Sequence, residues 1–236
     1  MGRVRRMNQD RFGVAEDLGL AVVCDGMGGP AGGEIASSVA VETFLAVMRQ
    51  EISNCRGSHN GLSRRALCRA TAAANRAVRA KAAFDTRFRG MGTTLVGARL
   101  DGRELTVVNV GDSRAYLLRG GAARQLTTDH SYVREQVRLG LMSETEASHS
   151  PLQSVITRAV GTEEDVQPDF FVEMVEPGDQ VLLCSDGLTR HVGERELAAA
   201  AELGQQPSAV CERLVALANE HGGSDNITCV LMRVSA

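Results

Sequence analysis

Short apolar runs rich in β-branched residues recur along the chain, and they predict strands. Turn signals separate these runs, and two of them, Asp101-Gly102 and Gly120-Gly121, favour tight antiparallel hairpins. A largely antiparallel sheet system is therefore expected. The predicted strands are 20–24, 94–100, 105–110, 115–118, 170–175, 181–184 and 227–234.

Helical spacing of apolar residues marks three further stretches. Residues 33–52 place Ile35, Phe44 and Met48 at helical intervals, and 62–84 is alanine-rich with frequent arginine. A third helix is predicted from Pro207, a favourable first-turn residue, to about residue 221, where two glycines follow.

Helices thus flank groups of strands along the sequence, and neither a flexible linker nor an internal repeat divides the chain. We therefore expect one α+β domain over residues 1–236. The stretch 131–161 mixes polar residues with small amphipathic pieces, which is typical of an excursion over a functional site.

Composition narrows the classes of function. A net charge of -3 and 3% aromatic residues, without tryptophan, argue against nucleic-acid binding by charge or by base stacking. No uninterrupted apolar run approaches the roughly 20 residues that cross a bilayer. We therefore expect a cytoplasmic protein without nucleic-acid or membrane partners.

Six cysteines lie at positions 24, 55, 68, 184, 211 and 229, and no two of them form a CxxC pair. The expected state of all six is a free thiol that behaves as a small buried hydrophobe in a reducing compartment.

Two carboxylates occupy matching positions. Asp25 and Asp186 each come directly after an apolar run, and each is followed by glycine. A strand that ends in Asp-Gly presents a carboxylate at the rim of the sheet, where the glycine lets the backbone approach a ligand. Oxygen ligands of this kind suit Mg²⁺ or Mn²⁺. A single Asp-Gly pair is usually only a turn, so the wider context decides.

Five motifs stand in order: NQD at 8–10, DGMGG at 25–29, GDSR at 111–114, SDG at 185–187 and SDNIT at 224–228. With GRVR at 2–5 and LTTDHS at 126–131, they make the chain resemble the metal-dependent protein phosphatases of type 2C (PPM family), in their compact bacterial form. The resemblance covers nearly the whole chain, and five ordered motifs are far more specific than any one of them.

The resemblance implies a four-layer αββα sandwich, in which two stacked antiparallel sheets are flanked by helices. It also implies hydrolysis of phosphoserine and phosphothreonine in proteins, with Mn²⁺ or Mg²⁺ as cofactor. A water bridging two divalent metals attacks phosphorus, and no phosphoenzyme forms. The expected partners are phosphorylated proteins, including a Ser/Thr protein kinase and its substrates, and the enzyme is expected to be monomeric and to reverse kinase signalling.

Metal ligands carry over by motif. Asp25 is expected to bridge two metals, and the Gly26 carbonyl to bind one. Asp186 and Asp225 complete the other principal site, while Asp10 acts through bound water. Asp112, together with Asp186, is expected to hold an additional third ion.

Arg5 matches the phosphate-binding arginine of the family, since a planar guanidinium holds two phosphate oxygens at once. Composition alone also allows a solvated arginine beside Arg3 and Arg6. Residues 131–161 are expected to form a flap. Relatives commonly carry an additional strand before Arg5, so an N-terminal edge strand is expected to be missing here.

Two positions depart from relatives. Met27 stands where many eukaryotic members have a histidine proposed to protonate the leaving group, so the general acid is open between a water, His130 and His149, and neither histidine is assigned. Gln9 replaces a glutamate of some relatives.

Two rival interpretations are open to test. Cys184 and Arg190 have the Cys-x5-Arg spacing of cysteine-dependent phosphatases, although Cys184 ends an apolar run and Asp186 would repel a thiolate. A noncatalytic phosphoprotein-binding module with a degenerate site is the second, and the intact set of aspartates argues against it.

Overall fold

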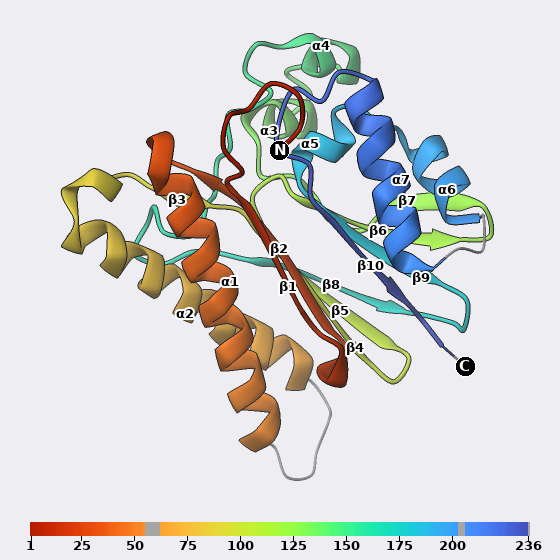
Figure 1. The fold of residues 1–236 in the computed structure, drawn as a ribbon, viewed down its shortest axis with the longest axis horizontal. Coiled ribbons are helices and arrows are strands. Elements are labelled where there is room, and N and C mark those ends of the chain that lie inside the picture. The colour runs from red at the N-terminus through yellow and green to blue at the C-terminus, as the bar shows by residue number, and fades with distance from the viewer. Residues whose placement is uncertain (55–61, 203–205, 236) are drawn as a thin grey trace.

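Two antiparallel sheets stacked face to face, with helices on both outer faces, make up the computed structural model, which describes residues 1–54, 62–202 and 206–235 (Figure 1). The first sheet has the order β1 (Asp10–Ala15), β2 (Leu20–Met27), β4 (Leu95–Asp101), β5 (Glu104–Val110), β8 (Asp169–Met174), and β3 (Gly92–Thr93) pairs with β2. The second has the order β10 (Cys229–Arg233), β9 (Gln180–Cys184), β6 (Arg114–Arg119), β7 (Ala122–Gln125). The predicted αββα sandwich is confirmed.

All of the predicted strands are present, and both predicted hairpins are confirmed. Asp101 pairs with Glu104 across the β4–β5 turn, and Arg119 pairs with Ala122 across the β6–β7 turn. Strands β1, β3 and β7 were not predicted. In β1, at the edge of the sheet, the large apolar side chain points to solvent, since Phe12 is 59% exposed. Apolar periodicity therefore carries little signal there.

Helices α1 (Gly29–Asn54) and α2 (Leu62–Phe84) cover the outer face of the first sheet, as predicted. Fully buried Phe44 and Met48 on α1 belong to the same core as Val22 and Cys24 on β2. On the other side, α7 (Pro207–Glu220) was predicted and α6 (Glu194–Glu202) was not. Both pack on the second sheet through Leu182 and its neighbours.

Strand β2 shows why this run is apolar throughout. Ala21 and Val23 face the core between the two sheets, whereas Leu20, Val22 and Cys24 face the helices. Both faces of the strand are therefore buried, and the apolar run ends at Asp25, where the strand reaches the rim.

Helix α1 includes a segment, Ala31–Asn54, with a mean hydropathy of 1.3, long and apolar enough by composition to cross a membrane. The count of uninterrupted apolar runs did not single it out. Its apolar face is occupied by packing, since Phe44 and Met48 have no exposed surface. These are the properties of a core helix.

The five cysteines in the described part of the chain are free thiols. Cys24 and Cys184 are buried, as expected, and Cys211 and Cys229 are half-buried. Cys68 on α2 is exposed, so the buried-hydrophobe interpretation is wrong for that residue. Its helix turns this position away from the sheet. Cys55 lies outside the described residues.

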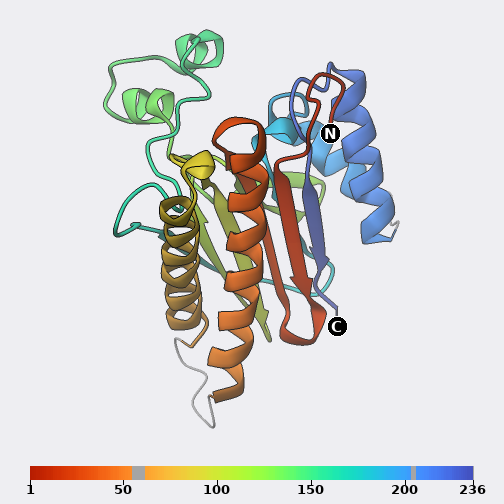
Figure 2. The same cartoon turned by 60° about the vertical axis from the view of Figure 1, so that its left-hand side comes forward.

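The segment 131–161 carries two short helices, α3 (Tyr132–Arg138) and α4 (Glu144–His149), and stands away from the sandwich (Figure 2). An antiparallel bridge between Ser131 and Ile156 closes its base. The remaining short elements are η1 (Glu16–Leu18), η2 (Thr86–Phe88) and α5 (Asp186–Thr189).

Candidate metal centre

The predicted carboxylates meet at one end of the sandwich. Asp10 and Asp25 are direct partners in the β1–β2 register, and Asp186 follows β9 at the corresponding rim of the second sheet. Asp112 follows β5, and Asp225 precedes β10. All except Asp10, which is buried, line a cavity of about 700 Å³.

Asp10 is only 2% exposed, and burial raises the pKa of its carboxyl. Its Oδ2 accepts a hydrogen bond from Ser185 Oγ at 2.8 Å, and Ser185 Oγ in turn accepts the Thr228 amide at 3.1 Å. Its Oδ1 is buried without a partner. A buried carboxylate oxygen without a donor needs a cation or a water to offset its desolvation.

Thr94 fixes the backbone of Asp25 through two hydrogen bonds. Its N–H donates to Thr94 Oγ1 at 2.9 Å, and its carbonyl accepts the Thr94 amide at 2.8 Å. Burial raises the pKa of the Asp25 carboxyl well above its usual value, and the negative charges of Asp10, Asp186 and the other carboxylates raise it further. Carboxylates so placed repel one another unless cations lie between them.

Asp112 and Asp186 make up the other side of the cavity. Burial, with the charge of Asp186, raises the pKa of Asp112 to about 7. Asp186 Oδ1 is buried without a partner, and its Oδ2 accepts a hydrogen bond from Arg190. The oxygen-only donors and the two unpartnered oxygens fit hard divalent cations such as Mn²⁺ or Mg²⁺.

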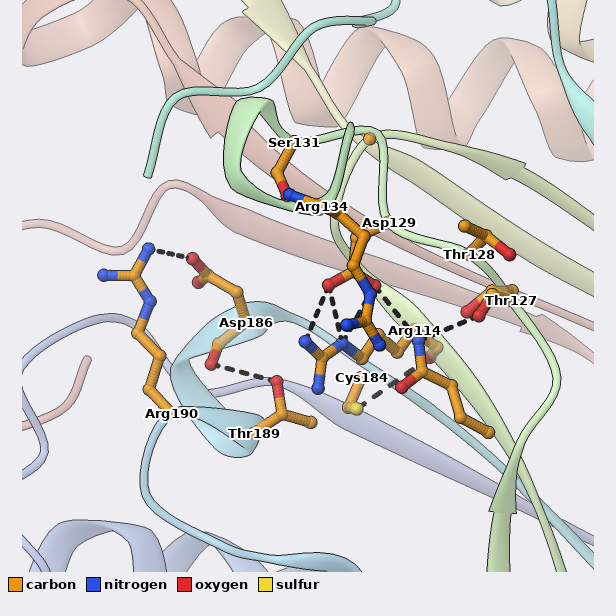
Figure 3. Close-up of polar contacts among 12 residues, drawn as sticks. Arg114, Thr127, Thr128, Asp129, Ser131, Arg134, Cys184, Asp186, Thr189 and Arg190 are labelled. Atoms are coloured by element: carbon orange, nitrogen blue, oxygen red, sulfur yellow. Dashed lines mark hydrogen bonds and ion pairs between the residues drawn. The ribbon is translucent and has the colours of Figure 1, made fainter. Parts of the chain in front are cut away.

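Two arginines hold part of this ligand set. Arg5 Nη2 lies 2.7 Å from Asp225 Oδ2, and Arg190 pairs with Asp186 (Figure 3). Within the described residues no three His, Cys, Asp or Glu side chains already form a cluster that could hold a metal ion. Arg5 therefore occupies Asp225 Oδ2 and Arg190 occupies Asp186 Oδ2, whereas Asp186 Oδ1 is left without a partner.

Gly26 lies at the close approach of β2 and α1. A Cβ at this position would lie 1.9 Å from the Gly33 carbonyl oxygen, so only glycine fits. Its N–H donates to the Gln9 carbonyl at 3.1 Å, and the Gln9 side chain donates to the Gly29 carbonyl at 2.8 Å. Gln9 thus supports the DGMGG turn through its backbone and its side chain.

The three N-terminal arginines have different surroundings. Arg3 donates through Nε to the Asn219 carbonyl at 2.8 Å, whereas Arg5 and Arg6 line the cavity. Of these two, Arg5 is the one in an ion pair with Asp225, and its side chain is 56% exposed. It is therefore available to a ligand that enters the cavity.

Neither candidate histidine borders the cavity, although Met27 does. His130 is 4% exposed, and its Nε2 lies 3.1 Å from Asp169 Oδ2. His149 is on α4, where its Nδ1 lies 2.8 Å from the Thr145 carbonyl oxygen. The described residues that line the cavity include no histidine, so this arrangement does not favour His130 or His149 as the general acid.

The cysteine interpretation is contradicted by the surroundings of Cys184. Burial raises the pKa of its thiol to about 12, and Sγ lies 3.8 Å from the Arg114 carbonyl oxygen within the sheet core. Arg190 pairs with Asp186 (Figure 3). A thiolate nucleophile is not available here.

Several supporting residues were not singled out in the sequence. Ser185 and Asn226 stand inside recognised motifs next to ligands, and that position was the available signal. Asn226 accepts the Gln9 amide at 2.8 Å and donates to the Met7 carbonyl at 2.9 Å, which ties the two ends of the chain together. Thr94 gave no signal, because a buried threonine at the start of an apolar run looks like an ordinary strand residue.

The segment 131–161 borders the metal-ligand cavity through Ser154 and Ile156. Arg190 donates to Ser154 Oγ at 3.1 Å, so one arginine contacts both this segment and a candidate ligand. A neighbouring cavity of about 430 Å³ lies between the segment and the body, and Asp112, Asp186 and Arg190 line both cavities.

The chain is similar in sequence and fold to known protein phosphatases. A family model described as "Protein phosphatase 2C" matches residues 3–231. The serine/threonine phosphatase stp of Listeria innocua is 36% identical over 98% of this chain and 92% of its own length. The serine/threonine protein phosphatase PstP of Mycobacterium tuberculosis is 35% identical over 99% of this chain, which spans 43% of that relative. The solved PstP catalytic domain in complex with two manganese ions has a TM-score of 0.85 at 33% identity, covering 100% of this chain and 95% of that one.

Proposed function

This chain belongs to the protein phosphatase 2C family and is a metal-dependent protein serine/threonine phosphatase, and from that premise we propose which of its residues carry the reaction. The observation that carries the proposal is the set of buried and partly buried, mutually repelling carboxylates around one open cavity, with unpartnered oxygens on Asp10 and Asp186.

Asp25 would be a ligand of both principal ions, the Gly26 carbonyl would be a ligand of one of them, and Asp186 and Asp225 would complete the site of the other. Asp10 would act through water, because it is buried behind the cavity lining. Asp112 with Asp186 would hold an additional ion. When bound, a pair of divalent ions supplies an activated water as nucleophile and offsets charge on the phosphoryl oxygens. Mn²⁺ and Mg²⁺ both fit oxygen donors, and the manganese in the related catalytic domain supports Mn²⁺.

Arg5 would bind the phosphate. Its guanidinium, now paired with Asp225, could instead donate two parallel hydrogen bonds to phosphoryl oxygens if Asp225 held a cation. Met27 cannot protonate the departing serine or threonine oxygen. We assign that proton to a water in the cavity, since the described lining residues include no histidine.

The proposed substrates are phosphoproteins, with a Ser/Thr kinase as the opposing enzyme. The proposed unit is a monomer built as one catalytic domain over residues 1–236, with 131–161 as its flap. A reducing cytoplasm suits the free thiols of the described cysteines.

The test is release of phosphate from a phosphothreonine protein with Mn²⁺, repeated with EDTA. Asp25→Ala and Asp186→Ala should lower turnover by roughly a thousandfold or more while the protein stays folded, because each removes a ligand on which the reaction depends. Asp17→Ala, a change at an exposed carboxylate paired with Arg49, is the matched control. Full activity in either ligand variant would remove the proposed site. A wild-type protein inactive with added Mn²⁺ would favour the noncatalytic binding module.

A further inference from the structure

His130 is buried between the loop that carries Asp112 and the base of the segment 131–161. It is only 4% exposed, yet it lies outside the cavity that holds the candidate ligands. The reaction described above makes no use of it. A buried histidine with specific partners on both ring nitrogens requires an explanation.

Both polar groups of the Gly111 residue are bound by His130. The Gly111 N–H donates to the His130 ring at Nδ1, at 3.2 Å, and the backbone N–H of His130 donates to the Gly111 carbonyl at 2.9 Å. Asn109 Nδ2 donates to the same carbonyl at 3.2 Å. The residue that follows is Asp112, so these bonds fix the backbone from which its carboxylate projects.

Position 111 accepts only glycine. Its φ is +104°, and a Cβ there would lie 2.6 Å from Thr94 Cγ2. On the other side of Asp112, Ser113 Oγ lies 2.7 Å from Thr94 Oγ1, and Thr94 also holds the backbone of Asp25. Asp112 is therefore held from both neighbours, by His130 on one side and by Thr94 on the other.

The contacts also specify the tautomer of the ring. Nδ1 accepts the Gly111 amide proton, so a neutral ring carries its proton on Nε2, which donates to Asp169 Oδ2 at 3.1 Å. Arg158 Nη1 also lies 3.4 Å from Nε2, but both groups are donors in this tautomer, and the Arg158 group donates to Asp169 Oδ1 instead. Burial lowers the pKa of His130, which agrees with a neutral ring. Arg158 shares Asp169 at 3.0 Å, and the His130 carbonyl accepts the Thr157 amide at 2.8 Å. Both of these residues belong to the base of the segment 131–161.

We propose that His130 is a positioning residue of the metal centre, which orients Asp112 toward the additional metal ion by accepting the Gly111 amide proton at Nδ1. The inference rests on the proposed function in one respect, the assignment of that ion to Asp112. Residues that orient metal ligands typically change metal affinity by roughly 10- to 100-fold when removed.

Two substitutions separate the roles of the two ring nitrogens. His130→Asn can keep an acceptor oxygen at the place of Nδ1, and His130→Gln can keep a polar group near Nε2 without that acceptor. His130→Ala removes both. Asp112→Asn in the same full-length chain serves as the reference for loss of the additional ion. Thermal melts of all four identify any variant that fails to fold.

The number of Mn²⁺ ions bound and their affinities are measured by titration, with EPR reporting the free Mn²⁺ concentration. We expect His130→Ala and His130→Gln to weaken the last Mn²⁺ to bind by roughly 10- to 100-fold, as Asp112→Asn does, and His130→Asn to stay near wild type. Normal Mn²⁺ binding by His130→Ala with only a lower Tm would overturn the proposal and leave an ordinary core histidine. Rescue by Gln in place of Asn would also overturn it.

If Asp112→Asn binds as many Mn²⁺ ions as wild type, with the same affinity, then Asp112 holds no additional ion and His130 has no such ion to serve. The principal ions would still be tested separately by Asp25→Ala.

A second measurement needs no metal. Long-range ¹H–¹⁵N spectra of the histidine-labelled protein should show a neutral ring protonated at Nε2. Protonation at Nδ1 would exclude the bond to Gly111 and overturn the proposal.

Discussion

The individual carboxylates at the rim of the sheets differ in their hydrogen-bond and ion-pair partners. Asp10 has one oxygen bonded to Ser185 and one without a partner, whereas Asp225 is paired with an exposed arginine. The arginine pair lies near solvent and contributes little to stability, so Arg5 can leave Asp225 at small cost. The same residue can then serve as a phosphate ligand.

Replacing Arg5 should therefore affect substrate binding far more than folding. Arg5→Ala should raise KM for phosphopeptide by roughly 10- to 100-fold, the equivalent of about 1.5–3 kcal/mol for a charged hydrogen bond. Arg5→Lys should restore little, because lysine lacks the planar pair of donors. Steady-state kinetics measure this, with Arg3→Ala, which removes a bond to the Asn219 carbonyl outside the cavity, as control. A wild-type KM in Arg5→Lys would show that a positive charge alone is enough to bind the phosphate.

At the scale of elements, one buried carboxylate holds the turn between β8 and β9 against β6. Asp179 is 4% exposed, accepts Arg119 Nε at 2.8 Å, and accepts the Glu176 amide at 2.7 Å. The hydrogen bonds from Arg119 lower the pKa of Asp179 below its usual value. The turn is thus stabilised by a charged network at the end opposite the metal centre.

Asp179→Asn should lower the free energy of unfolding by about 1–3 kcal/mol at pH 7, with kcat unchanged. Because the folded pKa is depressed, the ionised carboxylate contributes this stability above the unfolded pKa, and the contribution is lost as pH falls through the folded pKa. The difference in the free energy of unfolding between variant and wild type should therefore become smaller below about pH 4. Urea denaturation at both pH values measures it, and the exposed Asp165→Asn is the control.

The segment 131–161 is the other element with a predicted role. Arg134 on α3 pairs with Glu144 on α4 at 2.6 Å, which sets the relative position of its two helices. A small aryl phosphate needs only the metal centre and Arg5, whereas a phosphoprotein also contacts the surrounding surface.

Glu144→Lys combined with His149→Ala should lower kcat/KM for a phosphothreonine protein by roughly two- to fivefold and leave para-nitrophenyl phosphate turnover unchanged. Glu212→Lys, an exposed change on α7, is the control for added charge. Equal losses with both substrates would contradict the access role, since altered metal geometry would then account for the data.

At the scale of the whole molecule, the candidate metal centre joins parts of the chain that lie far apart in sequence. Asp10 contacts Ser185 across 175 positions, and Gln9 contacts Asn226 across 217. Binding of cations to this junction stabilises the folded state, because the unfolded chain does not bring the ligands together.

Mn²⁺ should therefore raise Tm. At one hundred times Kd, each site adds about 2.7 kcal/mol. For a chain of this size, that is on the order of 5–10 °C. Calorimetry with Mn²⁺ and with EDTA measures the shift, and Asp25→Ala should lose most of it. An equal rise in that variant would place the stabilising ion elsewhere.

The sequence by itself determined the elements whose residues repeat at a regular interval, since strand and helix periods depend on local backbone geometry. It therefore predicted the doubly buried β2, both hairpins and α2 to its observed ends. It also marked Asp25 and Asp186, because an aspartate at the end of a buried run is expected at a sheet rim, while the family motifs marked Asp10, Asp112 and Asp225.

Only the tertiary structure decided what those residues meet. In the edge strand β1 the alternating Phe12 and Val14 are exposed, so their pattern does not mark a buried face, yet the register of this strand sets Asp10 beside Asp25. His130 was a candidate acid in the sequence and a buried partner of Gly111 in the fold. Such contacts depend on pairing between distant segments, which no local period encodes, and that pairing turns separate motifs into one site.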